Sequence, residues 1–120
     1  MQISLDTTSG NQIKSYSPGK IQINESFYEN NIILTPTQII PWSIASFDQF
    51  REEHLNELMA LNPTVIILGT GHQQHWLSQK LIAMTYEKNI GIEIMMTDAA
   101  CRTYNVLLSE KRNVVAGLIV

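Results

Sequence analysis

The sequence has one cysteine, Cys101, among its 120 residues. A single cysteine cannot form an internal disulfide, which favours a reducing compartment. The longest uninterrupted apolar run, Val114 to Val120, is far shorter than the roughly 20 residues that a membrane-spanning helix needs. The first twenty residues contain no apolar segment of the kind found in signal peptides. These absences predict a cytoplasmic protein without a membrane anchor.

Charge is also scarce, since Asp, Glu, Lys and Arg make up only 16% of the chain. Eight Lys and Arg stand against eleven Asp and Glu, so no basic field is available for a nucleic acid. Hydrophobic residues reach 44%, which is typical of a globular domain. A chain of this length forms one ordinary domain with one core. We therefore expect a single domain over residues 1–120 and no nucleic-acid partner.

The N-terminal forty residues favour short strands and turns. Apolar residues alternate with polar ones at Ile3, Leu5, Ile13, Ile21 and Ile23. A buried-strand pattern follows at Ile32 to Leu34 and stops at Thr35-Pro36. This part predicts a small strand-rich layer.

From Ser46 onward, helix and strand patterns alternate. Ser46 and Gln49 fit a helix-capping box, and the apolar period continues to Leu61. Alternation of this kind predicts an α/β sheet covered by helices on both faces. The later elements expected are a strand at Val65 to Leu68, a helix after Gly71 with Leu77, Leu81 and Met84 on one stripe, a strand at Ile92 to Met95, a helix from Ala99 to Glu110 capped by Thr97 or Asp98, and a strand at Val114 to Val120.

Polar side chains gather where two of these strands end. If the strands are parallel neighbours, Gly69–Gly71 and Thr97–Asn105 meet on one rim, where α/β proteins often bind ligands. Two helix N-termini would then favour an anion, and Arg102 would add positive charge. The predicted ligand or partner residues are Gly69, Thr70, Gly71, Thr97, Arg102, Thr103 and Asn105.

Known cofactor motifs are not completed at this rim. Gln74 stands where a dinucleotide fingerprint needs its third glycine, and His72 and His75 have no further metal ligand nearby. We therefore expect neither a cofactor nor a metal. Cys101 has two interpretations. It could be a nucleophile paired with His72 or His75, or a core residue on one helix face with Tyr104 and Leu108. The aromatic residues Trp42, Trp76 and Tyr104, and the Met95-Met96 pair, are expected in the core or at its edge.

The sequence resembles domain-of-unknown-function family 498. The resemblance rests on Ile67 to Gly71, on the segment from Thr97 to Leu107, and on Glu110, Arg112 and Val114, with Pro36 and Trp42 in the first half. It implies a three-layer α/β fold with a mixed central sheet, in which one strand runs against the rest, and a small β layer. Two positions depart from the family pattern: Met96 replaces an Asp, and Lys111 replaces a Gly.

Two functions follow from these patterns. The family includes a mitochondrial assembly factor for respiratory complex I, so the resemblance implies a protein partner and an assembly-assisting role. The alternative is an enzyme that binds an anion or small molecule at the rim from Gly69 to Asn105, with Cys101 as its nucleophile. An interaction surface needs exposed apolar anchors, whereas catalysis needs a pocket with a perturbed titratable group.

Overall fold

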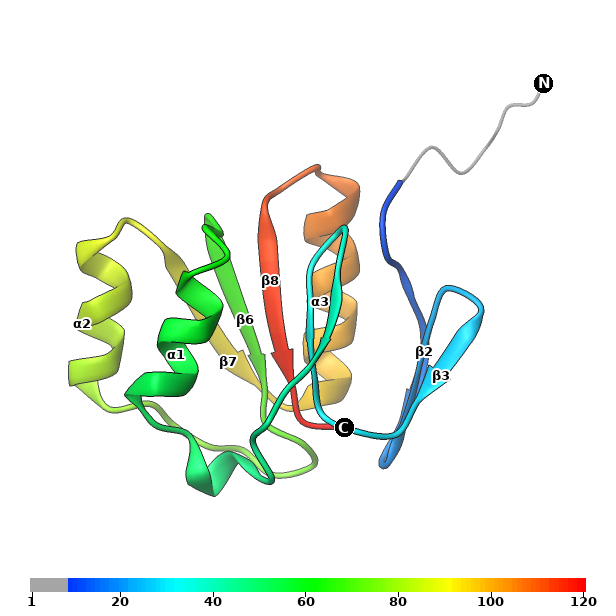
Figure 1. Cartoon of the computed structure of the whole chain (residues 1–120), viewed down its shortest axis with the longest axis horizontal. Coiled ribbons are helices and arrows are strands. Elements are labelled where there is room, and N and C mark those ends of the chain that lie inside the picture. The colour runs from blue at the N-terminus through cyan, green and yellow to red at the C-terminus, as the bar shows by residue number, and fades with distance from the viewer. Residues whose placement is uncertain (1–8) are drawn as a thin grey trace.

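The computed structural model describes residues 9–120 (Figure 1). The strand expected around Ile3 and Leu5 lies outside the described residues. The remaining chain forms a five-stranded sheet, a separate three-stranded sheet and three α-helices. No helix of the described chain combines the length and the apolar character required to cross a membrane.

The five-stranded sheet is mixed, as the family resemblance implies. Its order is β5-β4-β8-β6-β7. The three C-terminal strands, β6 (Val65–Gly69), β7 (Gly91–Met95) and β8 (Val114–Leu118), are parallel. Strand β4 (Ile32–Leu34) runs antiparallel to both β8 and β5 (Ile39–Pro41). The one reversed strand is therefore β4, and it comes from the N-terminal half.

The small β layer consists of three antiparallel strands. Strands β1 (Ile13–Ser17), β2 (Lys20–Ile23) and β3 (Ser26–Tyr28) follow one another in sequence and in space. Ile13, Ile21 and Ile23 are buried and belong to the same core cluster as the third helix. The N-terminal layer predicted from the sequence is therefore confirmed.

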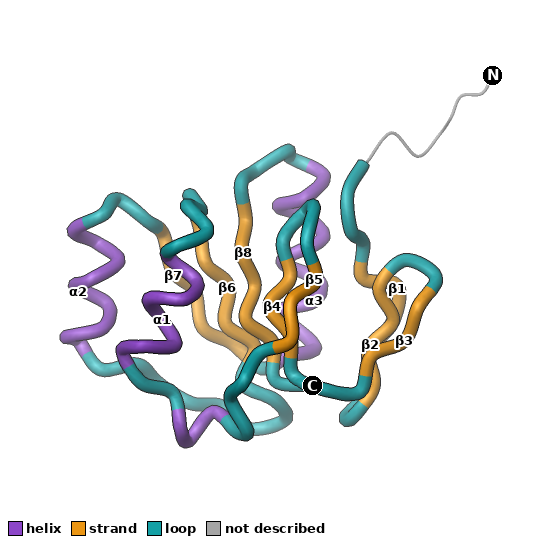
Figure 2. The backbone as a smooth tube through the Cα atoms, in the orientation of Figure 1, coloured by secondary structure: helices purple, strands orange, loops and turns teal. Residues whose placement is uncertain are grey.

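The helices lie on both faces of the central sheet (Figure 2). Helices α1 (Glu52–Met59) and α2 (Gln79–Glu87) cover one face, while α3 (Thr97–Ser109) and the small sheet cover the other. Side chains alternate accordingly along β6, where Ile66 and Leu68 face α1 and α2 and Val65 and Ile67 face α3. The result is a three-layer α/β domain with a core on each side of the sheet.

The helix expected from Ser46 is interrupted. A short 3-10 helix, η1 (Phe47–Gln49), ends at Phe50, whose backbone is extended, and α1 begins only at Glu52. The Ser46 side chain accepts no capping bond. Instead, the Arg51 backbone N–H donates to Nδ1 of His54 at 2.9 Å. The real start of the helix is therefore set by a histidine that the capping-box pattern does not contain.

The two later helices also begin at other residues than expected. Helix α2 starts at Gln79, and the side chain of its N-cap residue, Ser78, accepts a hydrogen bond from the Leu81 N–H. Residues 70–78 therefore form a loop. The N-terminus of α2 therefore does not lie at Gly69–Gly71, contrary to the sequence prediction. Helix α3 starts at Thr97, after Met96. The Thr97 hydroxyl does not cap the helix but bonds to the backbone of Gly71 and Ile119.

Candidate functional site

The loops that leave β6 and β7 lie side by side, as the sequence predicts. One loop leads to α2 and the other to α3, on opposite faces of the sheet, and this arrangement normally opens a ligand crevice. Here the Thr70 N–H donates to the Met95 carbonyl at 2.9 Å, and the Gly71 N–H donates to Thr97 Oγ1 at 2.7 Å. The two loops are thus bonded directly to each other.

Thr97 closes this crevice. Its N–H donates to the Gly71 carbonyl at 2.9 Å and its hydroxyl donates to the Ile119 carbonyl at 2.7 Å, while the residue is completely buried. Gly71 has a φ of +91°, a conformation that a residue with a side chain rarely adopts. The Gly69 carbonyl accepts the Ile119 N–H at 2.9 Å. The backbone donors expected to hold an anion are therefore used within the protein.

The polar residues of α3 point in different directions. Asn105 exchanges two hydrogen bonds with the backbone of Ile13, at 2.8 and 3.0 Å, and so ties the small sheet to α3. Thr103 Oγ1 lies 3.4 Å from the sulfur of Met95. These contacts place Asn105 on the β1 side of the helix and Thr103 on the β7 side.

Arg102 is separated from the glycine loop. Its side chain is 73% exposed, lies 4.0 Å from Asp98, and borders a shallow hollow of about 230 Å³ between β1 and α3. The lining of this hollow includes Lys14 and Cys101 but none of residues 69–71. The ligand-binding role assigned to Arg102, Gly69, Thr70, Gly71, Thr97, Thr103 and Asn105 stays a prediction.

Cys101 is a buried thiol within the core cluster that contains Tyr104 and Leu108. Burial, followed by the nearby Asp98 carboxylate, raises the pKa of Cys101 to about 12, and Arg102 offsets this only in part. The thiol is thus protonated at neutral pH, whereas a nucleophilic cysteine needs the thiolate. These features favour the core interpretation of the residue.

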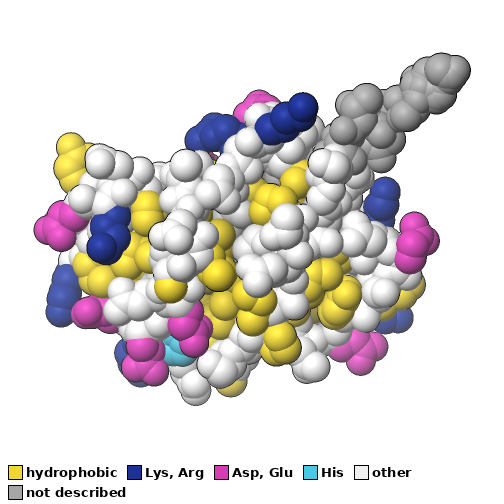
Figure 3. Space-filling view, turned by 45° about the horizontal axis from the view of Figure 1, so that its top comes forward, with side chains coloured by type: hydrophobic (Ala, Val, Ile, Leu, Met, Phe, Trp, Pro, Cys, Tyr) yellow, Lys and Arg dark blue, Asp and Glu magenta, His cyan; other side chains and the backbone are white. Residues whose placement is uncertain are grey.

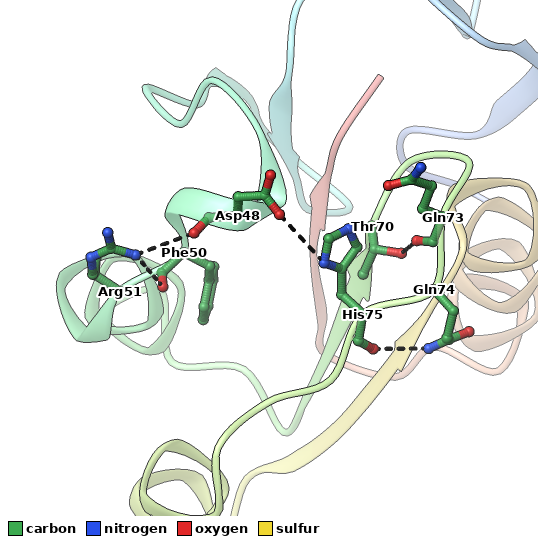
Figure 4. Close-up of polar contacts among 7 residues, drawn as sticks. All are labelled: Asp48, Phe50, Arg51, Thr70, Gln73, Gln74 and His75. Carbon is green, nitrogen blue, oxygen red and sulfur yellow. Dashed lines mark hydrogen bonds and ion pairs between the residues drawn. The ribbon is translucent and has the colours of Figure 1, made fainter.

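The histidines proposed as bases lie in the loop between β6 and α2. Figure 4 shows that His75 points toward Asp48 of η1, with Nδ1 3.8 Å from the carboxylate oxygen. The His75 ring also lies 5.2 Å from that of Phe47, and Thr70 Oγ1 donates to the Gln73 carbonyl within the loop. His75 therefore contacts η1 through both Asp48 and Phe47. In the part of the chain that is described, no three metal-ligating side chains converge.

Trp76 is not a core residue, contrary to the sequence prediction. It is 80% exposed at the end of the same loop, whereas Trp42 and Tyr104 are buried as expected. Met96 also differs from the prediction, with 39% exposure immediately after β7. Trp76 and Met96 are therefore two large apolar side chains in contact with solvent.

Strand β7 is an open edge of the central sheet. The opposite edge, β5, has three residues and ends in Pro41, which cannot donate to a neighbouring strand. Strand β7 has five residues and no proline. The Gly91 N–H and the Met95 carbonyl are both bonded on the β6 side, to Thr64 and Thr70. Because these directions alternate along a strand, the N–H and C=O groups of Ile92 and Ile94 point to the open side.

Exposed apolar side chains of α2 flank this edge. Lys80 Nζ lies 3.7 Å from a carboxylate oxygen of Glu52, which marks the side of α2 that faces α1. Ile82 and Tyr86, one turn apart, occupy the opposite side of the helix and are 43% and 81% exposed. Because α1 contacts β8 and α2 contacts β7, the side of α2 that faces away from α1 lies at the open edge of the sheet. We call Ile82, Tyr86, Met96 and the outer side of β7 the β7 surface.

Sequence reasoning missed the β7 surface. A usable signal was present, because Ile82 and Tyr86 fall outside the stripe of Leu77, Leu81 and Met84 that packs on the sheet. Two large apolar residues one turn apart on the outer face of a helix indicate a contact surface. On the face drawn in Figure 3, acidic and basic side chains are scattered around the margin, and hydrophobic and uncharged groups occupy the middle.

Comparison with known proteins gives a consistent family assignment. Residues 13–119 match the family model described as "Protein of unknown function (DUF498/DUF598)". The "13 kDa major membrane protein" of Francisella tularensis is 32% identical over 103 residues, which cover 84% of each chain. The NADH dehydrogenase [ubiquinone] 1 alpha subcomplex assembly factor 3 of Danio rerio is 32% identical over 116 residues, which cover 95% of this chain and 67% of that protein.

Solved structures show the same fold. A crystal structure of a protein from Bordetella parapertussis superposes with a TM-score of 0.86 at 30% sequence identity. The match covers 94% of this chain and 98% of the other. The fold predicted from the sequence is therefore shared with a protein whose structure was determined by experiment.

Proposed function

The chain belongs to the DUF498/DUF598 family, and we propose that it is a protein-binding domain that assists the assembly of a larger complex. The observation that carries the proposal is the β7 surface, where an open sheet edge lies beside exposed Ile82 and Tyr86. Exposed aromatic and aliphatic anchors next to unpaired backbone groups are what a protein contact requires. The relatives named as assembly factors support the same role.

The site geometry supports binding over catalysis. The crevice at the β6 and β7 strand ends is filled by internal hydrogen bonds, and the Cys101 thiol is buried with a raised pKa. Catalysis by acid, base or nucleophile needs a titratable group that substrate can reach. The cytoplasmic location expected from the sequence is part of the proposal and stays a prediction.

Site-specific photo-crosslinking in cells tests the proposal. A photoreactive phenylalanine analogue replaces Tyr86 in one variant and Phe27 in a matched control, since Phe27 is another exposed aromatic, on β3. We expect a covalent adduct with a defined protein at position 86 and none at position 27. The adduct should contain a subunit of a larger complex and be absent from the finished complex, because an assembly factor leaves its client. Equal labelling at both positions, or an adduct within the finished complex, would contradict this function.

A further inference from the structure

The free backbone groups of β7 specify the shape of the partner. Ile92 and Ile94 each direct an N–H and a C=O to the open side of the strand, as their positions between the bonded Gly91 and Met95 require. Such groups are satisfied by an added strand rather than by a helix. We propose that the partner contributes an extended segment that pairs with β7 and places a Lys or Arg opposite Glu93, between apolar residues. This inference rests on the proposed function and names the chemistry of the partner.

The alternation of β7 side chains gives the partner its pattern. Ile92 and Ile94 pack on the α2 side of the sheet, so partner residues beside them meet the exposed Ile82 and Tyr86. Glu93 points to the opposite side, toward α3, and is exposed. A paired strand therefore presents apolar side chains to α2 and, between them, one side chain to the Glu93 carboxylate.

Glu93 decides the charge of that side chain. It is the one charged residue of β7. Within residues 9–120, no Lys, Arg or His nitrogen lies within 4.0 Å of the Glu93 carboxylate. Opposite charges placed directly across two strands stabilise the pair, whereas like charges destabilise it. A basic residue in the partner segment is therefore favoured over an acidic one.

The same carboxylate disfavours a second copy of this chain as the partner. Antiparallel self-pairing of β7 engages all five residues only when Glu93 lies opposite Glu93 of the second copy. Shifting the register by two residues relieves this repulsion, but it leaves part of each strand unpaired. A different protein that carries a basic residue has neither penalty.

Peptide titration of the isotope-labelled full chain tests the inference. One probe is a short peptide that alternates valine with threonine and carries a central lysine, and the matched probe carries a central glutamate instead. We expect the lysine peptide to slow amide hydrogen exchange at Ile92 and Ile94. We also expect it to bind roughly fivefold more tightly than the glutamate peptide at low salt.

Charge variants supply the controls. Glu93→Gln should remove the preference between the two peptides and Glu93→Lys should reverse it, whereas Glu29→Lys, an exposed acid after β3, should leave it unchanged. The inference is overturned if neither peptide binds, if protection appears at β5 instead, or if Glu93→Lys retains the lysine preference. A dimer that the peptides dissociate would also overturn it. If any of these results occurs while the specific adduct at position 86 is still formed, only the strand-pairing model is wrong. If that adduct is not formed, the proposed function itself is wrong.

Discussion

The ring of Trp42 lies directly over Gly117 in the central strand β8. A Cβ atom built at Gly117 would lie 2.7 Å from Cη2 and 2.9 Å from Cζ3 of Trp42. Real side chains do not approach this closely, and Trp42 is itself buried among Phe50, Leu58 and Val115. The absence of a side chain at Gly117 thus leaves room for the Trp42 ring in the core on the α1 side.

Gly117→Ala should therefore destabilise the protein by about 1–3 kcal/mol, because the added methyl group overpacks the core. The measurement is urea unfolding followed by Trp fluorescence. Gly91→Ala is the matched control: position 91 also lies in a strand, but the nearest atom to its Cβ is 3.7 Å away. If both variants unfold at the same urea concentration as the parent, the close contact at Gly117 is not real.

Thr97 offers a test of the closed crevice. Thr97→Val keeps the shape of the side chain but removes the acceptor for the Gly71 N–H and the donor to Ile119. A buried N–H left without a partner costs about 1–3 kcal/mol, so we expect a loss of that size in the free energy of unfolding. Thr97→Ser retains the hydroxyl and should recover much of this loss. A valine variant as stable as the serine variant would show that these hydrogen bonds contribute nothing.

Lys111 occupies a position where glycine is preferred. Its φ is +61°, and its N–H donates to Leu108 while that of Arg112 donates to Leu107, which is the hydrogen-bond pattern of a Schellman cap. Lys111→Gly should stabilise the protein by roughly 0.5–1 kcal/mol, because it removes the steric cost of a side chain in this conformation. Lys111→Ala removes the charge but keeps the strain, so it should unfold like the parent. Equal melting temperatures for the glycine and alanine variants would contradict this account.

Cys101 should make the protein sensitive to alkali. Well below pH 9 the thiol is protonated in both the folded and the unfolded state. Between its ordinary pKa of 9.0 and the folded-state value of about 12, the unfolded thiol loses its proton while the folded one does not. The free energy of unfolding should then fall as pH rises, by up to about 1.4 kcal/mol per pH unit from this group.

Urea titrations between pH 8 and 11 measure this slope. Burial also raises the pKa values of Tyr16 and Tyr104, so these side chains add to the loss in the same direction. Cys101→Ala should reduce the slope without abolishing it. A variant whose stability varies with pH as the parent does, or rapid alkylation of native Cys101 at pH 7, would show that the thiol is accessible and ionisable.

Much of the fold could be predicted because local patterns and tertiary packing agree. The run from Val65 to Leu68 is apolar without interruption, and it forms a strand buried on both faces. The start of α2 could not be predicted, because His72 to Leu77 is compatible with a helix in sequence. The structure shows a loop there, in which His75 approaches Asp48 and Phe47 of η1.

The position of the β7 surface depends on which strands pair in the central sheet, and no local sequence pattern specifies this pairing. The sequence places β7 after α2 but does not reveal which strand lies at the edge of the sheet. That position follows from β8, which enters on the far side of β6. The edge position of Ile92 and Ile94 is therefore a consequence of long-range topology.

The central position of β8 has a consequence for how the chain folds as it is synthesised. Strands β4 and β6 are joined only through β8, which follows every other strand in the sequence. Until β8 has been synthesised, the edges of β4 and β6 that pair with it are open. The Trp42 ring also lacks the Gly117 backbone on which it packs. Folding must wait for these distant contacts, which makes it slow and leaves apolar edges open to other chains. The newly made protein should therefore need protection from aggregation until β8 has been synthesised.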